Sequence, residues 1–250
     1  MLIANVKGSY SFLKGIAPYS GGVVAAQGYE IIHARFRQPI PLVAGFDRAR
    51  AELEAAGRPV HALCGMELRS PQPFTFSGFG EFNARYVEVL REWDLLLNGM
   101  NPIARTNVAP EMGQPAEPSL YGFSYTVQSG HNAKTFVVAG GGELPEGSLE
   151  PAEVVRTGET SADALQQKAA FVMSLMTGRV HGLGVTWDDA TAVNVYTIHS
   201  ISGMLAGTIL KPIGNSAIHG VNWYYSRPPI VSIEYEMDLR DCRREIVLAR

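Results

Sequence analysis

The spacing of apolar residues predicts strands and helices in an order that occurs twice along the chain. Apolar positions three and four residues apart predict helices at residues 43–56, 81–97, 161–176 and 201–210. Alternating or short continuous apolar runs predict strands at residues 21–26, 29–36, 61–68, 104–109, 120–127, 134–142, 191–198, 220–226 and 231–239. Each half of the chain therefore follows the order β-β-α-β-α-β, and the second half adds one last strand.

The strand at residues 231–239 has the most regular pattern. Its apolar residues fall on one face, and the polar residues of the other face are Ser232, Glu234, Glu236 and Asp238. From spacing alone, Glu234 is more typical of a solvent-facing position in a sheet than of a catalytic residue.

Two segments rich in proline and glycine, at residues 109–118 and 140–151, predict loops. The first divides the chain nearly in half. We therefore predict two tandem α+β domains, residues 1–115 and 116–250, each a β-sheet covered by two helices.

The composition narrows the class of protein. Of 250 residues, 46% are hydrophobic and 18% charged, which is typical of a globular chain, and the formal net charge is −3. An acidic balance disfavours nucleic acid as a partner, and no apolar run is long enough to span a membrane. Cys64 and Cys242 are the only cysteines, and the first residues lack the apolar stretch of a secretory signal. We expect a cytoplasmic protein.

Motifs for the common cofactors are absent from the sequence. The six histidines are scattered without metal-ligand spacing, and neither GxGxxG nor a P-loop occurs, so we expect no metal and no cofactor. Gly140, Gly141 and Gly142 are more typical of a plain turn than of an anion cradle. Arg105 lies in an apolar extended segment, where its guanidinium fits either a bound carboxylate or a salt bridge between domains.

Four short motifs resemble those of the RidA/YjgF family, the reactive-intermediate deaminases also called endoribonuclease L-PSP-like. They are IAPYSGGV at residues 16–23, NPIARTNVA at 101–109, FVVAGGGEL at 136–144 and RPPIVSIEYEMDL at 227–239. Their order along both halves identifies the chain as a tandem two-copy member. The resemblance implies a chorismate-mutase-like fold for each domain and three-fold rings with ligand clefts between neighbouring domains.

The resemblance also implies site residues. It assigns Arg105 to the substrate carboxylate and Glu234 to the attacking water, and it gives substrate-binding roles to Tyr19, Tyr121, Ala139 and Gly140. Neither copy holds the full set, because Gly220 stands at the arginine position of the second copy. The resemblance therefore implies a composite cleft, in which Arg105 of one domain faces Glu234 of a neighbouring one.

These residues lead to two expected functions. The first is hydrolytic deamination of a small carboxylate-bearing enamine or imine, such as 2-aminoacrylate or 2-aminomuconate, to a 2-oxo acid and ammonia. The alternative is a non-catalytic member that binds small carboxylates or acts as a chaperone. In both, the partners are a small carboxylate and further copies of the chain, as a trimer of two-domain chains, with no nucleic acid and no membrane.

Overall fold

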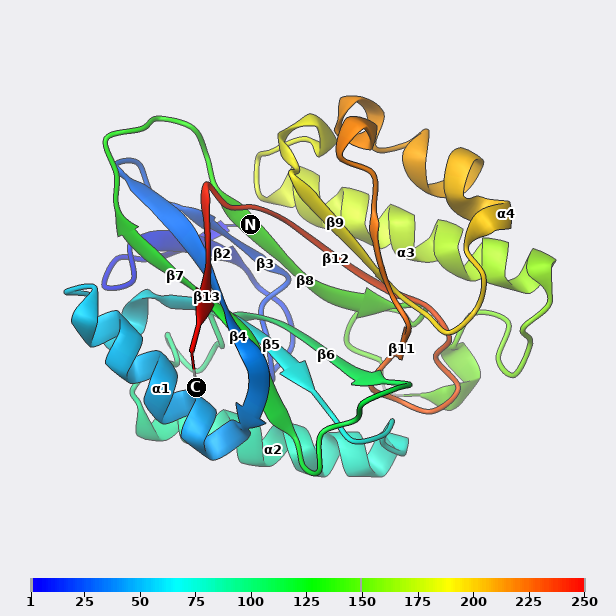
Figure 1. Cartoon of the computed structure of the whole chain (residues 1–250), viewed down its shortest axis with the longest axis horizontal. Helices are drawn as coiled ribbons and strands as arrows, with labels where there is room; N and C mark the ends of the chain where they lie inside the picture. The colour runs from blue at the N-terminus through cyan, green and yellow to red at the C-terminus, as the bar shows by residue number, and fades with distance from the viewer. Residues whose placement is uncertain (1, 149, 250) are drawn as a thin grey trace.

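The computed structural model describes residues 2–148 and 150–249, which form two β-sheets with helices on their outer sides. In Figure 1, α1 and α2 lie on one side of the strands and α3 and α4 on the other. Strands β6 and β8 bring the two sheets into contact. The order of layers is therefore helices, sheet, sheet, helices, and the candidate site lies between the sheets.

The first sheet has seven strands in the order β1-β2-β3-β8-β12-β9-β10. Its strands are β1 (Leu2–Asn5), β2 (Tyr10–Leu13), β3 (Gly22–Ala25), β8 (Phe136–Gly142), β12 (Glu236–Asp241), β9 (Ala192–Tyr196) and β10 (Asn222–Tyr224). All neighbours are antiparallel except β9 and β10, which are parallel.

The second sheet has six strands in the order β11-β6-β5-β7-β4-β13. They are β11 (Ser226–Arg227), β6 (Ala104–Pro110), β5 (Leu63–Arg69), β7 (Ser119–Gln128), β4 (Tyr29–Pro41) and β13 (Arg244–Leu248). Strand β13, from the end of the chain, pairs in parallel with β4 from its beginning, and Figure 1 shows the two side by side.

The longer helices begin where a side chain caps the first turn. Helix α2 (Phe76–Glu92) begins after Thr75, whose hydroxyl accepts the N–H of Gly78, and α3 (Ala162–Gly182) begins after Ser161, which caps Ala164 in the same way. Helix α1 (Leu42–Ala55) covers β4 and β7. At residues 201–210 the chain forms only the short α4 (Ser202–Met204) and a π-helical turn. No helix of the described chain is long and apolar enough to cross a membrane.

Of the four buried apolar clusters among the described residues, three fill the layers, and the fourth, which includes Phe79, Ile230 and Ile233, lies at the candidate site. One packs α3 on the seven-stranded sheet, a second packs α1 and α2 on the six-stranded sheet, and a third lies between the sheets. The third cluster is small, and polar groups share its space: Thr106 on β6 donates to Asp238 on β12 across the sheets at 2.7 Å. Buried polar groups of this kind require partners, so they hold the sheets in a fixed register.

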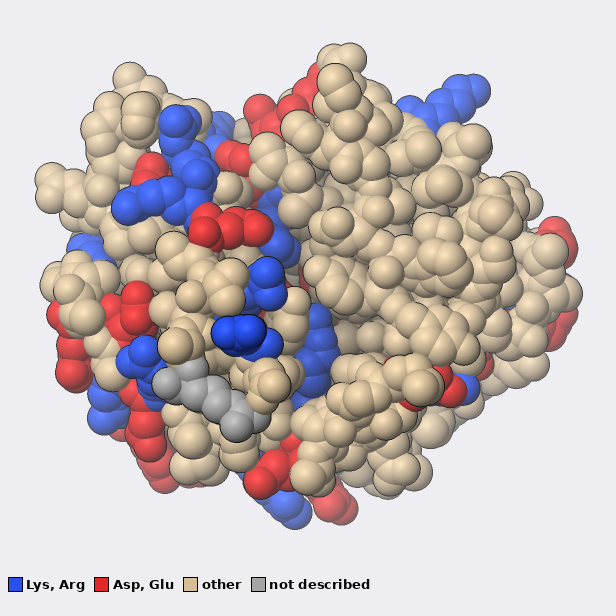
Figure 2. Space-filling model, in the orientation of Figure 1, with Lys and Arg blue, Asp and Glu red and all other residues tan. Residues whose placement is uncertain are grey.

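Charged side chains are unevenly spread over the surface. Figure 2 shows Lys, Arg, Asp and Glu intermixed over α1, β4 and β13, and a broad area with almost none over α4 and β10. Some of these charged residues hold the last strand in place: Arg244 of β13 forms an ion pair with Glu30 of β4 at 2.7 Å.

The predicted fold, two tandem chorismate-mutase-like domains with a sheet each, is wrong. Each sheet combines strands from both halves of the chain: β1, β2 and β3 join β8, β12, β9 and β10, and β4, β5 and β6 join β7, β11 and β13. The boundary expected after residue 115 falls in the connection between β6 and β7. Strand β7 pairs over its length with β4 and β5. Alternation along a strand shows which face is buried, but not which strand is its neighbour.

Candidate active site

A cavity of about 70 Å³ lies where β6, β8 and β12 pass one another between the sheets. Its polar lining residues are Tyr19, Arg105, Asn107, Glu146, Ser148, Arg179 and Glu236, and its apolar residues include Phe79, Ile230 and Ile233. A hollow with converging polar groups and an apolar wall is the usual form of a small-molecule site. Among the described residues, no group of histidines, cysteines and carboxylates could hold a metal ion.

Arg105 is buried on β6 and has an unused hydrogen-bond donor. Its Nη2 donates to Asn83 Oδ1 of α2 at 2.7 Å, whereas its Nη1 has no partner in the described structure. Four aromatic rings surround the guanidinium at 4.8–5.8 Å, from Tyr19, Phe79, Phe82 and Tyr86. Burial lowers the pKa of Arg105, but a guanidinium keeps its proton in proteins.

The sequence left two interpretations of Arg105, a bound carboxylate or a salt bridge between domains, and its surroundings distinguish them. Within the described chain the guanidinium forms no ion pair, so it is not part of a salt bridge between segments. Burying a cation with an unpaired N–H costs free energy of folding unless an anion binds to that N–H. The position is therefore suited to an incoming carboxylate.

Glu236 on β12 lines the same cavity and is buried. Burial, and less strongly the neighbouring Asp238, raise the pKa of Glu236 well above its usual value, against the opposing effect of Arg105 and Arg179. This shift favours the protonated carboxylic acid, the form that can donate a proton.

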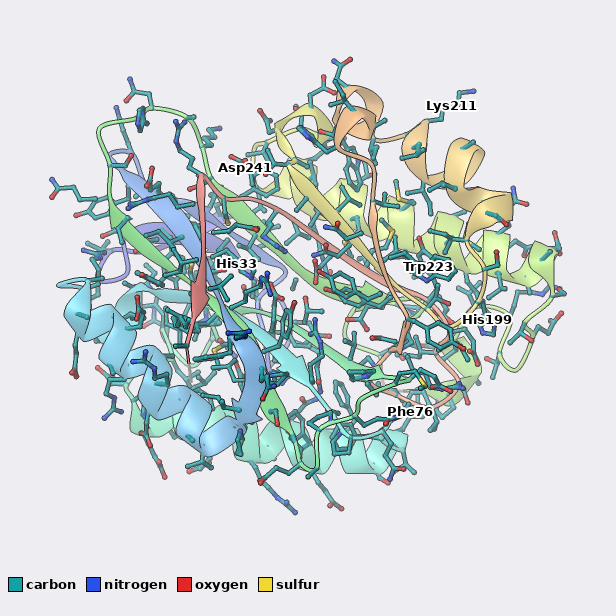
Figure 3. The ribbon with its side chains drawn as sticks, in the orientation of Figure 1. His33, Phe76, His199, Lys211, Trp223 and Asp241 are labelled. Carbon is teal, nitrogen blue, oxygen red and sulfur yellow. The ribbon has the colours of Figure 1, made fainter. Side chains whose placement is uncertain are left out.

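Glu234, the acid implied by the resemblance, is not among the described residues that line this cavity. Its Oε2 lies 2.8 Å from Nε2 of His199, which Figure 3 labels on the same side of the view as Trp223. The strand expected from residue 231 begins only at Glu236, because Ser232 has a φ of 76° and the chain turns there. The structure thus brings Arg105 together with Glu236 rather than with Glu234.

A buried ion pair fixes the chain just before Glu236. The carboxylate of Glu143 accepts the backbone N–H of Glu234 at 2.6 Å and that of Tyr235 at 3.0 Å. The same carboxylate forms an ion pair with Lys168 of α3, whose Nζ lies 3.1 Å from Glu143 Oε1. These bonds take the place of strand pairing and determine where β12 begins.

The other expected site residues separate into two groups. Tyr19 and Gly140 line the cavity, and Ala139 lies directly beneath it, where its carbonyl accepts a bond from Arg179 Nη1 at 2.8 Å. Tyr121 on β7 lies instead against Arg69, 4.0 Å from the guanidinium to the ring centre, away from the cavity lining that the structure describes.

A β-bulge shapes the floor of the cavity. The pairing of β8 with β12 shifts between Met237 and Leu239, so that Ala139 and Gly140 together lie opposite Asp238. Bulges of this kind redirect neighbouring side chains and are common next to active sites.

Gly140→Ala tests whether this floor matters for function. A Cβ at Gly140 would collide with Glu236 Oε1 and lie 3.1 Å from the methyl group of Thr106. We expect kcat/KM on the enzyme's substrate to fall at least about tenfold, because Glu236 must move. The control is Gly80→Ala in α2, where the described structure leaves open space for the methyl group, and we expect full activity there. Equal losses in both variants would contradict the role of the floor.

Arg179 is the main lining residue that sequence reasoning missed. It lies on α3 beyond residue 176, where the helix was expected to end. Residues 172, 176 and 179 continue one buried stripe of α3, so an arginine on an otherwise apolar stripe was the available signal.

Comparisons with known proteins place the whole chain near one family. The family model described as "2-aminomuconate deaminase CnbZ" matches residues 2–246. A 2-amino-5-chloromuconate deaminase from Comamonas testosteroni is 41% identical over 244 residues, which cover 96% of each chain. A crystal structure of a chorismatase superposes with a TM-score of 0.49 at 11% identity, over 88% of this chain and 77% of that one.

The resemblance to the RidA/YjgF (endoribonuclease L-PSP-like) family, and with it the tandem two-copy arrangement, is wrong. The family that matches along residues 2–246 is a distinct one, and the four motifs are too short and degenerate to separate the two. The three-chain assembly expected from that resemblance stays a prediction, which the molar mass in solution would test.

Proposed function

The chain belongs to the 2-aminomuconate deaminase CnbZ family, and on this premise we propose that it hydrolyses a 2-aminomuconate-type enamine to a 2-oxo acid and ammonia. Membership makes the chain a deaminase, an enzyme that acts on a carbon–nitrogen bond. One observation carries the finer proposal: within one chain, the unused donor of Arg105 and the buried carboxyl group of Glu236 line the same cavity.

In this proposal, Arg105 binds the carboxylate next to the amino-bearing carbon. Its Nη1–H is available for an anion, and Asn83 holds the other end of the guanidinium. Burial raises the pKa of Tyr19, so its hydroxyl keeps its proton and can donate a second bond to the substrate. Phe79, Ile230 and Ile233 give the conjugated carbon chain an apolar wall.

Glu236 moves the protons. In its protonated form, which burial favours, Glu236 protonates the enamine carbon, so that the C=C bond is lost and a C=N bond forms. The Glu236 carboxylate then takes a proton from a water molecule as that water adds to the imine carbon. Glu236 passes this proton to the nitrogen, and the C–N bond breaks as the added hydroxyl forms the C=O bond and returns its proton to Glu236. The products are ammonia and the 2-oxo acid, and the carboxylic acid is restored. Enamine and water together hold all the atoms of the two products.

Ammonia release tests the proposal. We expect the protein, mixed with 2-aminomuconate or 2-amino-5-chloromuconate generated in situ, to release one ammonia per substrate faster than the uncatalysed reaction. The control is Arg91→Gln, an exposed residue of α2 that forms an ion pair with Glu88, and it should be fully active. Ammonia release at the uncatalysed rate, with carboxylates still raising the melting temperature, would instead identify a non-catalytic carboxylate-binding protein.

A further inference from the structure

Arg179 stands at the boundary between the cavity and a second hollow. This second hollow, here called the outer groove, has a volume of about 530 Å³ and is lined by residues that include Leu13, Lys14, Gly21 and Phe171. The cavity and the outer groove share three lining residues, Glu146, Leu175 and Arg179. A ligand longer than the cavity would therefore meet Arg179 as it extends into the groove.

The guanidinium of Arg179 is only partly satisfied. Its Nη1 donates to the carbonyls of Ala139 and Gly140, and its Nη2 donates to Glu146 Oε1 at 2.8 Å. Its Nε, although buried, has no hydrogen-bond partner in the part of the chain that the structure describes. Because Nε–H and Nη2–H point from the same edge of the planar group, this edge could bind a carboxylate through both donors. Glu146 occupies only half of it.

The groups that cover this edge are small or partly exposed. Gly21 has no side chain beside it, and even a Cβ at Gly21 would lie 3.8 Å from Nε and 3.7 Å from Glu146 Oε1. The Arg179 side chain is 6% exposed, whereas that of Glu146 is 40% exposed and can turn toward water. Lys14, exposed on the wall of the outer groove, adds a second positive charge there.

We propose that Arg179 binds a second carboxylate, at the end of the substrate far from the amino group, through its Nε–Nη2 edge. This inference rests on the proposed function, because a 2-aminomuconate-type substrate is a conjugated dicarboxylate. Arg105 holds the carboxylate beside the amino-bearing carbon, and Arg179 holds the distal one when Glu146 turns away. Two fixed cations then select dicarboxylates over monocarboxylates and determine which end of the substrate faces Glu236.

Binding of two inert ligands tests the proposal without relying on turnover. trans,trans-Muconate carries both carboxylates, and sorbate is the same diene with a methyl group in place of one of them. Neither has an amino group to lose. For the wild-type chain, calorimetry should give about 10- to 100-fold tighter binding of muconate than of sorbate, as expected for one additional charge-assisted pair.

Two variants isolate Arg179 and its competitor. Arg179→Gln should weaken muconate to the affinity of sorbate and leave sorbate unchanged. Glu146→Gln, at a half-exposed position, should tighten muconate several-fold and again leave sorbate unchanged, because the competing carboxylate is removed. Arg91→Gln serves as the control for loss of an arginine far from the cavity.

The outcomes separate this inference from the proposed function. Equal binding of muconate and sorbate by the wild-type chain, or equal weakening of both by Arg179→Gln, would overturn the second carboxylate site even if ammonia is released. If Arg179→Gln does not fold, unchanged muconate affinity in Glu146→Gln would overturn it. Muconate selectivity that depends on Arg179 supports the site, even in a protein that releases no ammonia.

Discussion

Arg105→Gln is expected to lower kcat/KM for deamination by about 10²–10³-fold, the usual effect of removing one preorganised donor from an active site. The variant loses the N–H that is unused in the empty cavity, and with it the charge that orients the substrate carboxylate. Arg105→Lys should be nearly as inactive, because an ammonium group cannot serve both Asn83 and a ligand in the geometry of the guanidinium. Steady-state kinetics on the dicarboxylate enamine measures both.

The melting temperature of Arg105→Gln shows whether the lost activity reflects lost substrate binding or a damaged fold. Arg105 is a buried cation without an ion pair in the described structure, so its removal should leave the melting temperature unchanged or raise it. The matched control is Arg69→Lys, another buried arginine among aromatic rings but outside the cavity lining, which should keep its activity. Loss of activity in proportion to loss of stability in Arg105→Gln would show a structural role instead.

Glu236→Gln is expected to lower kcat by about 10²–10⁴-fold, as the loss of a general acid or base typically does. The amide has the same shape as the neutral acid but cannot transfer a proton. The matched control is Glu234→Gln, two residues earlier, whose partner is His199 outside the cavity; it should retain activity within a few-fold. The reverse result would return the catalytic role to Glu234, as the resemblance to the RidA/YjgF family implied.

The raised pKa of Glu236 gives this prediction a pH dependence with a definite sign. In the unfolded chain a glutamate ionises near pH 4.3, whereas the buried side chain keeps its proton to a higher pH. Between these two pKa values the folded state binds more protons, so the contribution of Glu236 to stability declines as the pH rises. Glu236→Gln should therefore be more stable than wild type at neutral pH, and wild-type activity should fall as the pH rises through the folded pKa. Urea unfolding and a pH profile of kcat measure the two effects.

The local pattern of the sequence predicted most elements but not their partners. Alternation located β5, β6 and β7 within two residues at each end, and Ser161 marked the start of α3. The start of α2 was missed by five residues, because Thr75 caps a turn that begins with glycines and aromatic residues. Sheet membership was beyond such reasoning, since pairing of β4 with β13 joins residues at opposite ends of the chain.

Local patterns in the sequence likewise indicated only some of the residues that line the cavity. The short motifs drew attention to Arg105, Tyr19 and Gly140, which the structure places at one cavity, although the family that the motifs indicated is wrong. The choice between Glu234 and Glu236 depends on one turn at Ser232. The role of Arg179 depends on the packing of α3 against β8. Backbone turns and long-range packing of this kind leave no periodic signal in a single sequence.

A crystal structure of the wild-type chain with trans,trans-muconate bound tests the central claim most directly, that one chain holds the complete deaminase site between its two sheets. We expect a carboxylate oxygen of the ligand about 3 Å from Arg105 Nη1, with the adjacent diene carbons against Glu236. A ligand bound elsewhere with the cavity empty, or one that contacts Glu234 and His199 in place of Glu236, would contradict it.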